Sequence, residues 1–308
     1  MTPGICFICE SNTTFLITKF GYRLTQCPAC KLVSMDPQPT TAELSALYSA
    51  DSGYHTHFSK KYIDAQTKKF SDRIIGTQEI LSRKNLTCFD IGAANGLFLD
   101  TAKQLGLTTA GIEMNEVNAK LCRDNGHDVV TGTIDTFTFT EKYDLIHLGD
   151  VLEHMIDPRT VIQKVKHALT TNGIVIIALP NASGLFQRAS LRLAKFFSID
   201  WPHPLPPAHT FQFSRNNLDL LLSSEDLLPV KHSYLNTSFM AEMRDTIYFQ
   251  TIYNFIKQKK GTLSLFLMHA TMFVLIGCLY FPFWLIGHLH YAVTNHGSYV
   301  TVWYQNKP

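Results

Sequence analysis

The chain has 308 residues, of which 45% are hydrophobic and 17% charged, and its formal net charge is +2. This length allows one large domain with additions, or two domains. The small net charge excludes a general basic field for nucleic acid. The first residues lack a basic stretch that leads into an apolar core, so we expect no secretory signal. Four of the seven cysteines form CxxC pairs, which favours a reducing compartment over a disulfide framework.

Residues 1–35 are predicted to form a metal-binding knuckle, because two CxxC pairs are separated by 17 residues. Each pair can form a tight turn that offers two thiolates, and two such turns make a closed tetrahedral site suited to Zn²⁺. Iron fits the same ligands. Metal binding would supply folding energy to so short a segment, so its role would be structural. The predicted ligands are Cys6, Cys9, Cys27 and Cys30.

Residues 36–85 are predicted to be a linker with lid helices. A short helix is expected over residues 42–48, and residues 58–83 show the periodicity of a long amphipathic helix. Polar and aromatic side chains of this segment are candidates to face a ligand, although core contacts and a solvated face explain the same pattern. These candidates are Tyr54, Tyr62, Lys69 and Arg73.

The central pattern is a β–α–β unit. A buried strand over residues 86–91 precedes a glycine-rich turn, a helix over 97–105 and a second strand over 108–112. Glycine in the turn lets the backbone approach a ligand. Glu113 ends the second strand, where a carboxylate can accept hydrogen bonds from the two hydroxyls of a ribose.

The sequence of the turn, DIGAANG at residues 90–96, distinguishes between two classes of nucleotide-binding turn. A dinucleotide turn requires G-x-G-x-x-G, but Ala94 and Leu97 stand where its second and third glycines belong. The turn instead resembles motif I, D-x-G-x-G-x-G, of class I S-adenosylmethionine-dependent methyltransferases. In that resemblance, Asp90 attracts the ammonium group of the cofactor.

A second stretch strengthens this resemblance. After helical residues 118–125 and a short strand over 127–131, a fourth strand covers residues 143–148 and runs into GDVLEHMIDP, residues 149–158. This segment is similar to the D-V-L-E-H-(V/I)-x-D-P stretch of the same family. A helix over 159–169, an Asn172-Gly173 turn and a strand over 174–179 follow.

With its cysteine knuckle, the chain resembles zinc-knuckle class I methyltransferases, a group that includes sugar C-methyltransferases and quinone-type O-methyltransferases. The resemblance implies an α/β, Rossmann-like, seven-stranded sheet, with an S-adenosylmethionine-binding domain over residues 86–262. It implies cofactor contacts for the residues of the turn and of the strand ends. These are Asp90, Gly92, Ala94, Gly96, Glu113, Met114, Thr133, Ile134 and Gly149.

Two histidines are candidates for the base that takes a proton from the acceptor, since imidazole titrates near neutral pH. His154 follows the fourth strand at the end where α/β ligands bind. His209 lies in PPAHTFQFS, which resembles the acceptor-side segment of the family, although Ala208 replaces the glutamate of sugar C-methyltransferases. Some quinone O-methyltransferases bind a divalent metal near the first region, so Glu153 with His154 is a candidate pair for that role.

Residues 183–213 are predicted to form an acceptor-side insert. Residues 185–197 read as a basic amphipathic helix, which suits a membrane surface, an anionic group or a lid with a solvated edge. The proline-rich residues 201–207 are expected to form a rigid loop. A helix over 216–223 and a sixth strand over 230–236 are expected to follow.

Residues 263–294 are predicted to form a hydrophobic helical insert before the last strand and tail, residues 295–308. The stretch 263–281 is long enough to match one bilayer core, and lysines precede it. Pro282 is expected to break it from a second helix over 283–293. If a last strand over 299–304 closes the sheet, the insert must be a re-entrant or in-plane hairpin. Burial in a homodimer interface and a true membrane span are the alternatives.

We therefore expect a methyltransferase on the cytoplasmic face of a membrane, acting on a small-molecule acceptor that includes lipid-linked compounds and sugars. The pattern leaves O- and C-methylation open. A non-catalytic zinc-ribbon membrane adaptor is the alternative from another class. An RNA methyltransferase is disfavoured, since the chain lacks a basic stripe and an N-P-P-(Y/F) motif after the fourth strand, so no nucleic-acid partner is expected.

Overall fold

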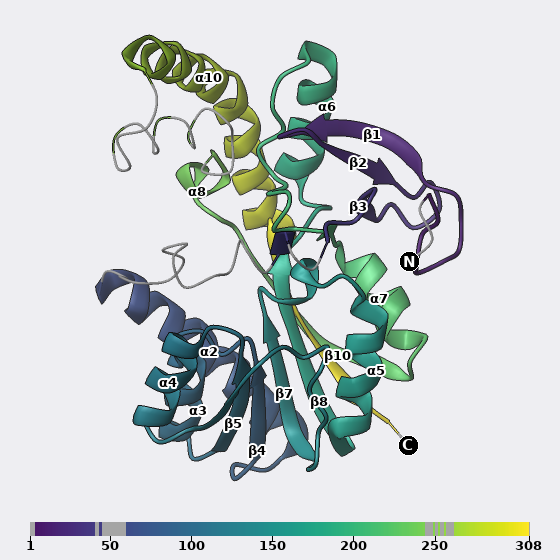
Figure 1. Ribbon diagram of the computed structural model, residues 1–308, viewed down its shortest axis with the longest axis vertical. Coiled ribbons are helices and arrows are strands. Elements are labelled where there is room, and N and C mark those ends of the chain that lie inside the picture. The colour runs from purple at the N-terminus through teal and green to yellow at the C-terminus, as the bar shows by residue number, and fades with distance from the viewer. Residues whose placement is uncertain are drawn as a thin grey trace. The chain divides into compact units, whose positions relative to one another are not determined.

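The computed structural model describes residues 4–40, 43–44, 60–243, 249, 252, 256 and 262–307. The chain divides into two compact units, each assembled from separate stretches of sequence (Figure 1). The first unit comprises residues 1–38, 180–217 and 233–300, and the second comprises 39–179, 218–232 and 301–308. Residues 43–44 of the expected helix over 42–48 are helical, and the rest of it, Tyr54 and the side chain of Tyr62 lie outside the described residues.

A seven-stranded sheet forms the centre of the second unit, in the order β10-β11-β8-β7-β4-β5-β6. The pairings of β4 with β5 and β7, of β5 with β6 and of β7 with β8 are parallel. This confirms the expected α/β class and the mostly parallel sheet. The strands are β4 (Thr87–Ile91), β5 (Thr108–Glu113), β6 (Asp128–Thr131), β7 (Tyr143–Gly149), β8 (Leu169–Pro180), β10 (Leu227–Leu235) and β11 (Tyr299–Asn306).

Helices cover this sheet because each one buries an apolar face. In α3 (Leu97–Gln104), Phe98, Leu99 and Ala102 are buried, and they join a core that contains Trp303 of β11. α4 (Glu116–Asp124) is capped by the side chain of Asn115. The other helices of the region are α2 (Lys60–Leu81), α5 (Pro158–Ala168) and α7 (Arg215–Ser223).

β8 is longer than the predicted strand. The pairing moves from Tyr143 opposite Leu169 to Leu145 opposite Ile174, so the residues between Leu169 and Ile174 form a bulge. Asn172 adopts a left-handed φ of 63° in this bulge. The predicted Asn172-Gly173 turn therefore exists, but it lies inside the strand.

The first unit contains a four-stranded sheet, in the order β1-β2-β3-β9. β1 (Thr14–Lys19), β2 (Tyr22–Gln26) and β3 (Val33–Met35) come from the N-terminal segment, whereas β9 (Phe211–Gln212) comes from the acceptor-side insert. β3 and β9 pair antiparallel, with Val33 opposite Gln212. Their core also takes in Ala194 and Trp201, so the cysteine-containing segment and the insert share one hydrophobic core.

Among the described residues, the first unit also contains the helices α6 (Leu185–Phe197), α8 (Phe239–Met243) and α10 (Leu263–Thr294). The prediction that Pro282 separates two helices is wrong, because α10 continues through it for 32 residues. Buried residues on both sides of the proline hold the helix in place, Ile276 and Tyr280 before it and Gly287 after it. These contacts offset the one backbone hydrogen bond that proline removes. By length and composition, α10 is apolar enough to cross a membrane.

Candidate functional site

The glycine-rich turn follows β4 and has the backbone geometry that its sequence predicts. Gly92 and Gly96 have φ values of 77° and 82°, in the left-handed region that favours glycine. The space is restricted too, since a Cβ on Gly96 would lie 3.0 Å from the Sγ of Cys122. Ala94 is also left-handed, with φ of 47°. The turn is thereby held open by its small residues at the carboxyl end of β4.

Glu113, at the end of β5, binds this turn directly. Its Oε2 accepts a hydrogen bond from the backbone N–H of Ala94 at 2.9 Å, and its Oε1 accepts one from Asn115 at 2.8 Å. Burial raises the pKa of Glu113, and these two backbone donors oppose the rise. A carboxylate oxygen can accept more than one hydrogen bond, so capacity remains for ribose hydroxyls.

The second carboxylate, Asp90, is held by a buried chain of hydrogen bonds. The Nδ1 of His147 lies 2.8 Å from Oδ1 of Asp90, and its Nε2 lies 3.0 Å from Nη1 of Arg73. Arginine can only donate, so Nε2 accepts and Nδ1–H donates to Asp90. Burial lowers the pKa of His147, and Arg73 lowers it further against the opposing charge of Asp90. The link connects α2 to the motif I carboxylate through a neutral imidazole.

His147 escaped the sequence analysis, although Arg73 was a candidate. Its ring stacks on Phe98 with a centroid distance of 3.9 Å. A Cβ on Gly149 would lie 2.6 Å from Cε1 of His147, so the glycine at this predicted cofactor position makes room for the imidazole. The available signal was a histidine inside an otherwise apolar parallel strand, where a polar side chain requires a buried partner.

Three further predicted cofactor residues lie at neighbouring strand ends. Met114 follows β5 and is 41% exposed. Thr133 is half-buried after β6 and its hydroxyl lies 3.4 Å from that of Thr136. Ile134 is only 3% exposed, so its side chain belongs to the core and only its backbone is near the surface.

Glu153 and His154 lie in a short 3₁₀ helix, Leu152–His154, that follows β7. Nε2 of His154 is 4.0 Å from Oε1 of Glu153. Burial raises the pKa of Glu153 well above its usual range, and the charge of Asp150 adds to the rise. Asp150 also affects Lys69 of α2. Burial and the charge of Arg73 lower the pKa of Lys69, and the charge of Asp150 opposes this change. Titratable groups therefore gather at the carboxyl end of β7.

His209, the other predicted base, belongs to the first unit. Its backbone N–H donates to the carbonyl of Leu205 at 2.8 Å, which closes the proline-rich loop before β9. Its assignment as a base stays a prediction.

The four predicted metal ligands come together in the first unit. Their Sγ atoms all lie within 4.8 Å of one another, with Cys6–Cys30 at 3.6 Å and Cys9–Cys27 at 3.4 Å. A tetrahedron with Zn–S bonds of about 2.3 Å has edges of about 3.8 Å, so the geometry fits zinc. The residues after the two pairs, Glu10 and Lys31, are both left-handed, with φ of 58° and 64°. The two knuckles thus share one backbone form.

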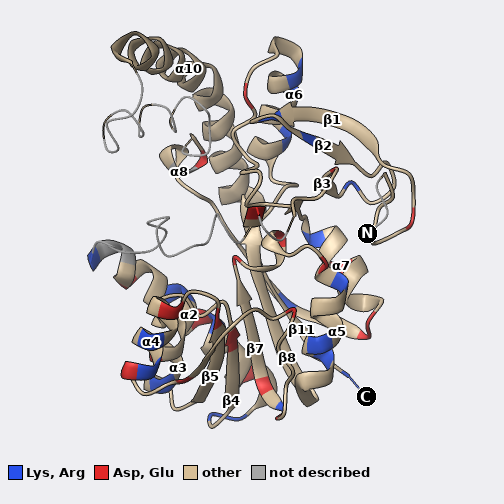
Figure 2. Cartoon of the chain, viewed as in Figure 1, with Lys and Arg blue, Asp and Glu red and all other residues tan. Residues whose placement is uncertain are grey.

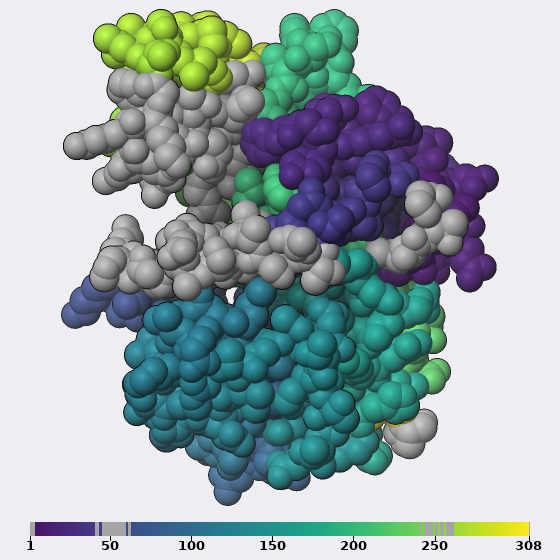
Figure 3. Space-filling model, viewed as in Figure 1, coloured from purple at the N-terminus to yellow at the C-terminus, as the bar shows by residue number. Residues whose placement is uncertain are grey.

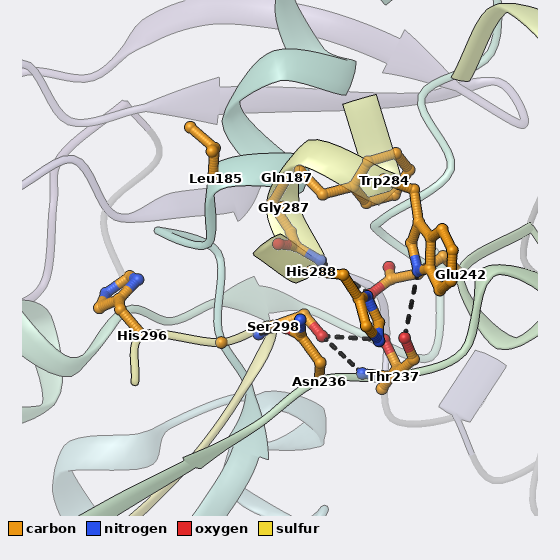
Figure 4. A pocket seen from close by; sticks show the side chains of 12 residues that line it. Leu185, Gln187, Asn236, Thr237, Glu242, Trp284, Gly287, His288, His296 and Ser298 are labelled. Carbon is orange, nitrogen blue, oxygen red and sulfur yellow. Dashed lines mark hydrogen bonds between the residues drawn. The ribbon is translucent and has the colours of Figure 1, made fainter. Parts of the chain in front are cut away.

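A polar pocket lies in the first unit between α6, α8 and α10 (Figure 4). Glu242 accepts hydrogen bonds from the side chains of Gln187 and Thr237 there. The ring of Trp284 packs against His288 with a centroid distance of 4.2 Å. The cavity measures about 10 Å³, which is room for one water molecule. The pocket is a cluster of hydrogen-bonded polar side chains between helices, and it is too small for a cofactor.

Comparison with known proteins identifies the family of the chain. A family model described as a methyltransferase domain matches residues 56–231, which is more than half of the chain. The structure is similar to that of 1,6-didemethyltoxoflavin-N1-methyltransferase from Burkholderia thailandensis, which was solved with S-adenosylhomocysteine. The TM-score is 0.53 at 12% identity, over 95% of this chain and 98% of the other. This likeness shows the fold.

Curated relatives match part of the chain. A ubiquinone biosynthesis O-methyltransferase from Bradyrhizobium diazoefficiens is 27% identical over 124 residues, 38% of this chain and 48% of the relative. One from Actinobacillus pleuropneumoniae is 31% identical over 104 residues, 30% of this chain and 44% of the relative. The chain thus spans about half the length of the curated relatives it matches. The chain belongs to the methyltransferase domain family.

Proposed function

We propose that the enzyme methylates an oxygen of a small lipophilic acceptor and that His154 takes the proton which the acceptor hydroxyl loses. The observation that carries this proposal is the pair of Glu153 and His154, directly after β7 in the cofactor unit. The match to relatives named ubiquinone biosynthesis O-methyltransferase supports an acceptor with a hydroxyl and an apolar body.

The residues at the strand ends have separate tasks in this proposal. The chemistry that S-adenosylmethionine supplies when bound is an electrophilic methyl group on sulfur. Asp90, held by His147, attracts the ammonium group, and Glu113 accepts from the ribose hydroxyls. Both carboxylates are buried, so their charges act with little screening by water. Met114, Thr133 and Ile134 would border the adenine.

His154 supplies the base. A neutral imidazole can take the proton of a hydroxyl near neutral pH. The remaining catalytic effect is alignment of the acceptor oxygen with the methyl group, which proximity alone can provide in large part.

The test is a methyl-transfer assay on the full chain with His154→Asn. We expect kcat to fall by about 10²- to 10⁴-fold, as general-base removal does, while the Kd for S-adenosylmethionine stays within about twofold. His167→Asn, a change at an exposed histidine of α5, is the matched control. Full transfer by the His154 variant would exclude it as the base.

The acceptor class is tested with a catechol that carries a prenyl tail and with the same catechol without a tail. We expect kcat/KM to be at least about tenfold higher with the tail, since each buried methylene contributes about 0.8 kcal/mol. Equal values would contradict a lipophilic acceptor.

C-methylation of a sugar is the second candidate. The four-cysteine knuckle shares a hydrophobic core with the insert that holds His209, which is the pairing of features that suggested sugar C-methyltransferases. Transfer of a deuterated methyl group, followed by NMR of the product, distinguishes a carbon from an oxygen as the methylated atom.

A further inference from the structure

α10 has two faces of different character. The packed face carries Ile276, Tyr280 and Gly287, which are buried against α6 and against the residues around α8. Phe239 lies 5.7 Å from Trp284, and Phe249 lies 5.9 Å from Phe273, between ring centroids. These two aromatic contacts therefore lie along the packed face of α10.

The opposite face of α10 is exposed and apolar from end to end. Its residues are spaced one, three, four or six positions apart, which places them on one side of a helix. From the first to the last of them is about 39 Å at 1.5 Å per residue. The helix contains no Asp, Glu, Lys or Arg. The large apolar side chains of this face are Leu267, Met268, Val274, Leu275, Phe281, Leu285, Ile286, Leu289 and Val293.

An exposed apolar strip of this length is far larger than the scattered apolar residues of a water-facing surface. Figure 3 shows α10 at the surface of the molecule, and Figure 2 colours α10 as uncharged and marks the Lys and Arg positions of α6 in blue. A helix in contact with water would carry charged residues on this face. The composition of the strip therefore points to an apolar medium.

α6 supplies the complementary charge. It packs antiparallel to α10, since Phe186 meets Gly287 near its start and the hydroxyl of Tyr280 donates to the carbonyl of Asp200 beyond its end. Arg188, Arg192 and Lys195 are exposed along one side of α6. Phe196 and Phe197, which end the helix, are 81% and 50% exposed. Basic residues beside exposed aromatic rings are typical of a helix at an anionic lipid surface.

The direction of α10 distinguishes a helix in the membrane plane from one that crosses. β10 and β11 are neighbours in the sheet, so the insert between them leaves and returns on the same side. The residues before α10 include Lys257, Lys259 and Lys260. Crossing would carry these lysines to the far side of the bilayer, which the preference for positive charge on the cytoplasmic side opposes.

We propose that α10 lies in the plane of an anionic membrane, with its exposed face among the acyl chains of one leaflet and the basic side of α6 at the headgroups. The packed face of α10 stays in contact with the rest of the first unit, and α10 does not cross the bilayer. This membrane-binding surface is a property separate from methyl transfer, and the proposal does not depend on the identity of the acceptor.

The native cysteine at position 278 allows a direct test of depth. Cys278 is an exposed residue on the apolar face, and Leu267 and Leu289 lie 11 residues before and after it on the same side of the helix. An environment-sensitive dye is placed at Cys278, or at Leu267→Cys or Leu289→Cys in a Cys278→Ser background. The full chain is bound to vesicles of phosphatidylcholine and phosphatidylglycerol that contain quenchers at known depths.

We expect all three dyes to shift to shorter wavelength and to report the same shallow depth. Neighbouring positions would differ by about 16 Å in depth if the helix crossed, since 11 residues rise by that amount. A steady change of depth from Leu267→Cys to Leu289→Cys would therefore overturn the in-plane arrangement. The matched control is Val117→Cys on α4, 68% exposed in the second unit, whose dye should stay in water.

The basic side is tested with Arg192→Gln plus Lys195→Gln. We expect this variant to bind anionic vesicles about fivefold more weakly per residue changed, and neutral vesicles equally well. Lys68→Gln plus Lys120→Gln, two exposed lysines on α2 and α4, is the control. If the dye at Cys278 instead becomes buried without vesicles, in proportion to protein concentration, the face joins a second copy of the chain and the proposal is wrong.

Discussion

A buried imidazole between a guanidinium and a carboxylate can adopt one tautomer only, and His147 is in that position. Its value to the enzyme is orientation. With Nδ1–H fixed on Oδ1 of Asp90, the orientation of this carboxylate is set by the imidazole. Arg73 links the same imidazole to α2.

We predict that His147→Phe, which keeps the stacking on Phe98, raises the Kd for S-adenosylmethionine by about 10- to 100-fold. This is the range expected from loss of one hydrogen bond to a charged group. His127→Phe is the matched control, because His127 is another buried histidine of the same unit that bonds an aspartate, Asp100. Calorimetry should show weaker cofactor binding in the first variant alone, although both lose stability. Equal Kd values in the two variants would exclude a positioning role.

His203 should make stability depend on pH. Burial lowers its pKa to about 3, with Lys19 adding to the effect, against an unfolded value of about 6.5. The unfolded chain therefore binds the proton first, so stability is full above pH 6.5 and falls as the pH falls. The loss reaches about 2 kcal/mol at pH 5, from 1.36 kcal/mol per unit.

We expect His203→Phe to flatten the pH dependence of the free energy of unfolding between pH 6.5 and 5. The ring contact with Trp201 survives in this variant. Denaturant titrations of both proteins at pH 7.5 and 5 measure the difference. An unchanged slope would mean that His203 is hydrated in solution.

At the scale of elements, local sequence patterns predicted most of the second unit. The strands and helices around DIGAANG and GDVLEHMIDP lie within a few residues of their expected bounds, because apolar periodicity and end signals are local. Residues brought together from distant positions escaped. His147 binds partners 57 and 74 residues away, and β9 has only two residues. Pro282 misled for a related reason, since tertiary packing on both sides overrides the local rule.

β11 anchors α2 through one side chain, and this contact is testable. The indole N–H of Trp303 donates to the carbonyl of Arg73 at 3.2 Å and lies 3.1 Å from the hydroxyl of Thr77. We predict that Trp303→Phe lowers stability by about 1–3 kcal/mol and speeds hydrogen exchange in the middle of α2. Trp201→Phe, in the first unit, should leave α2 exchange unchanged. Uniform exchange in the Trp303 variant would contradict the anchor.

At the scale of the whole molecule, each unit has its own chemistry. The second unit holds the predicted cofactor residues, and the first holds the four clustered cysteines, the predicted acceptor-side insert and α10. The first unit is assembled from three stretches of sequence, so its stability depends on closing a long chain around a small core. A structural metal is a strong compensation for that cost.

We predict that chelation of zinc loosens the first unit as a whole, including α6, and leaves the Kd for S-adenosylmethionine within about threefold. Cys30→Ser should reproduce the effect, and Cys278→Ser, a change of an exposed cysteine outside the cluster, should not. Limited proteolysis and cofactor binding, measured on the same samples, separate the two units. Retention of protease resistance after full metal removal would show that the knuckle is not needed for the fold.

The pairing of β3 with β9 also sets an order of events during synthesis. The ribosome releases β1, β2 and β3 first. β9, which completes their sheet, is made only after β4 to β8 of the second unit. Until then the edge of β3 is open to other nascent chains, which is a hazard for aggregation. Early metal binding by the four cysteines would keep these three strands folded until β9 is made. Zinc supply during translation should therefore govern the yield of folded protein.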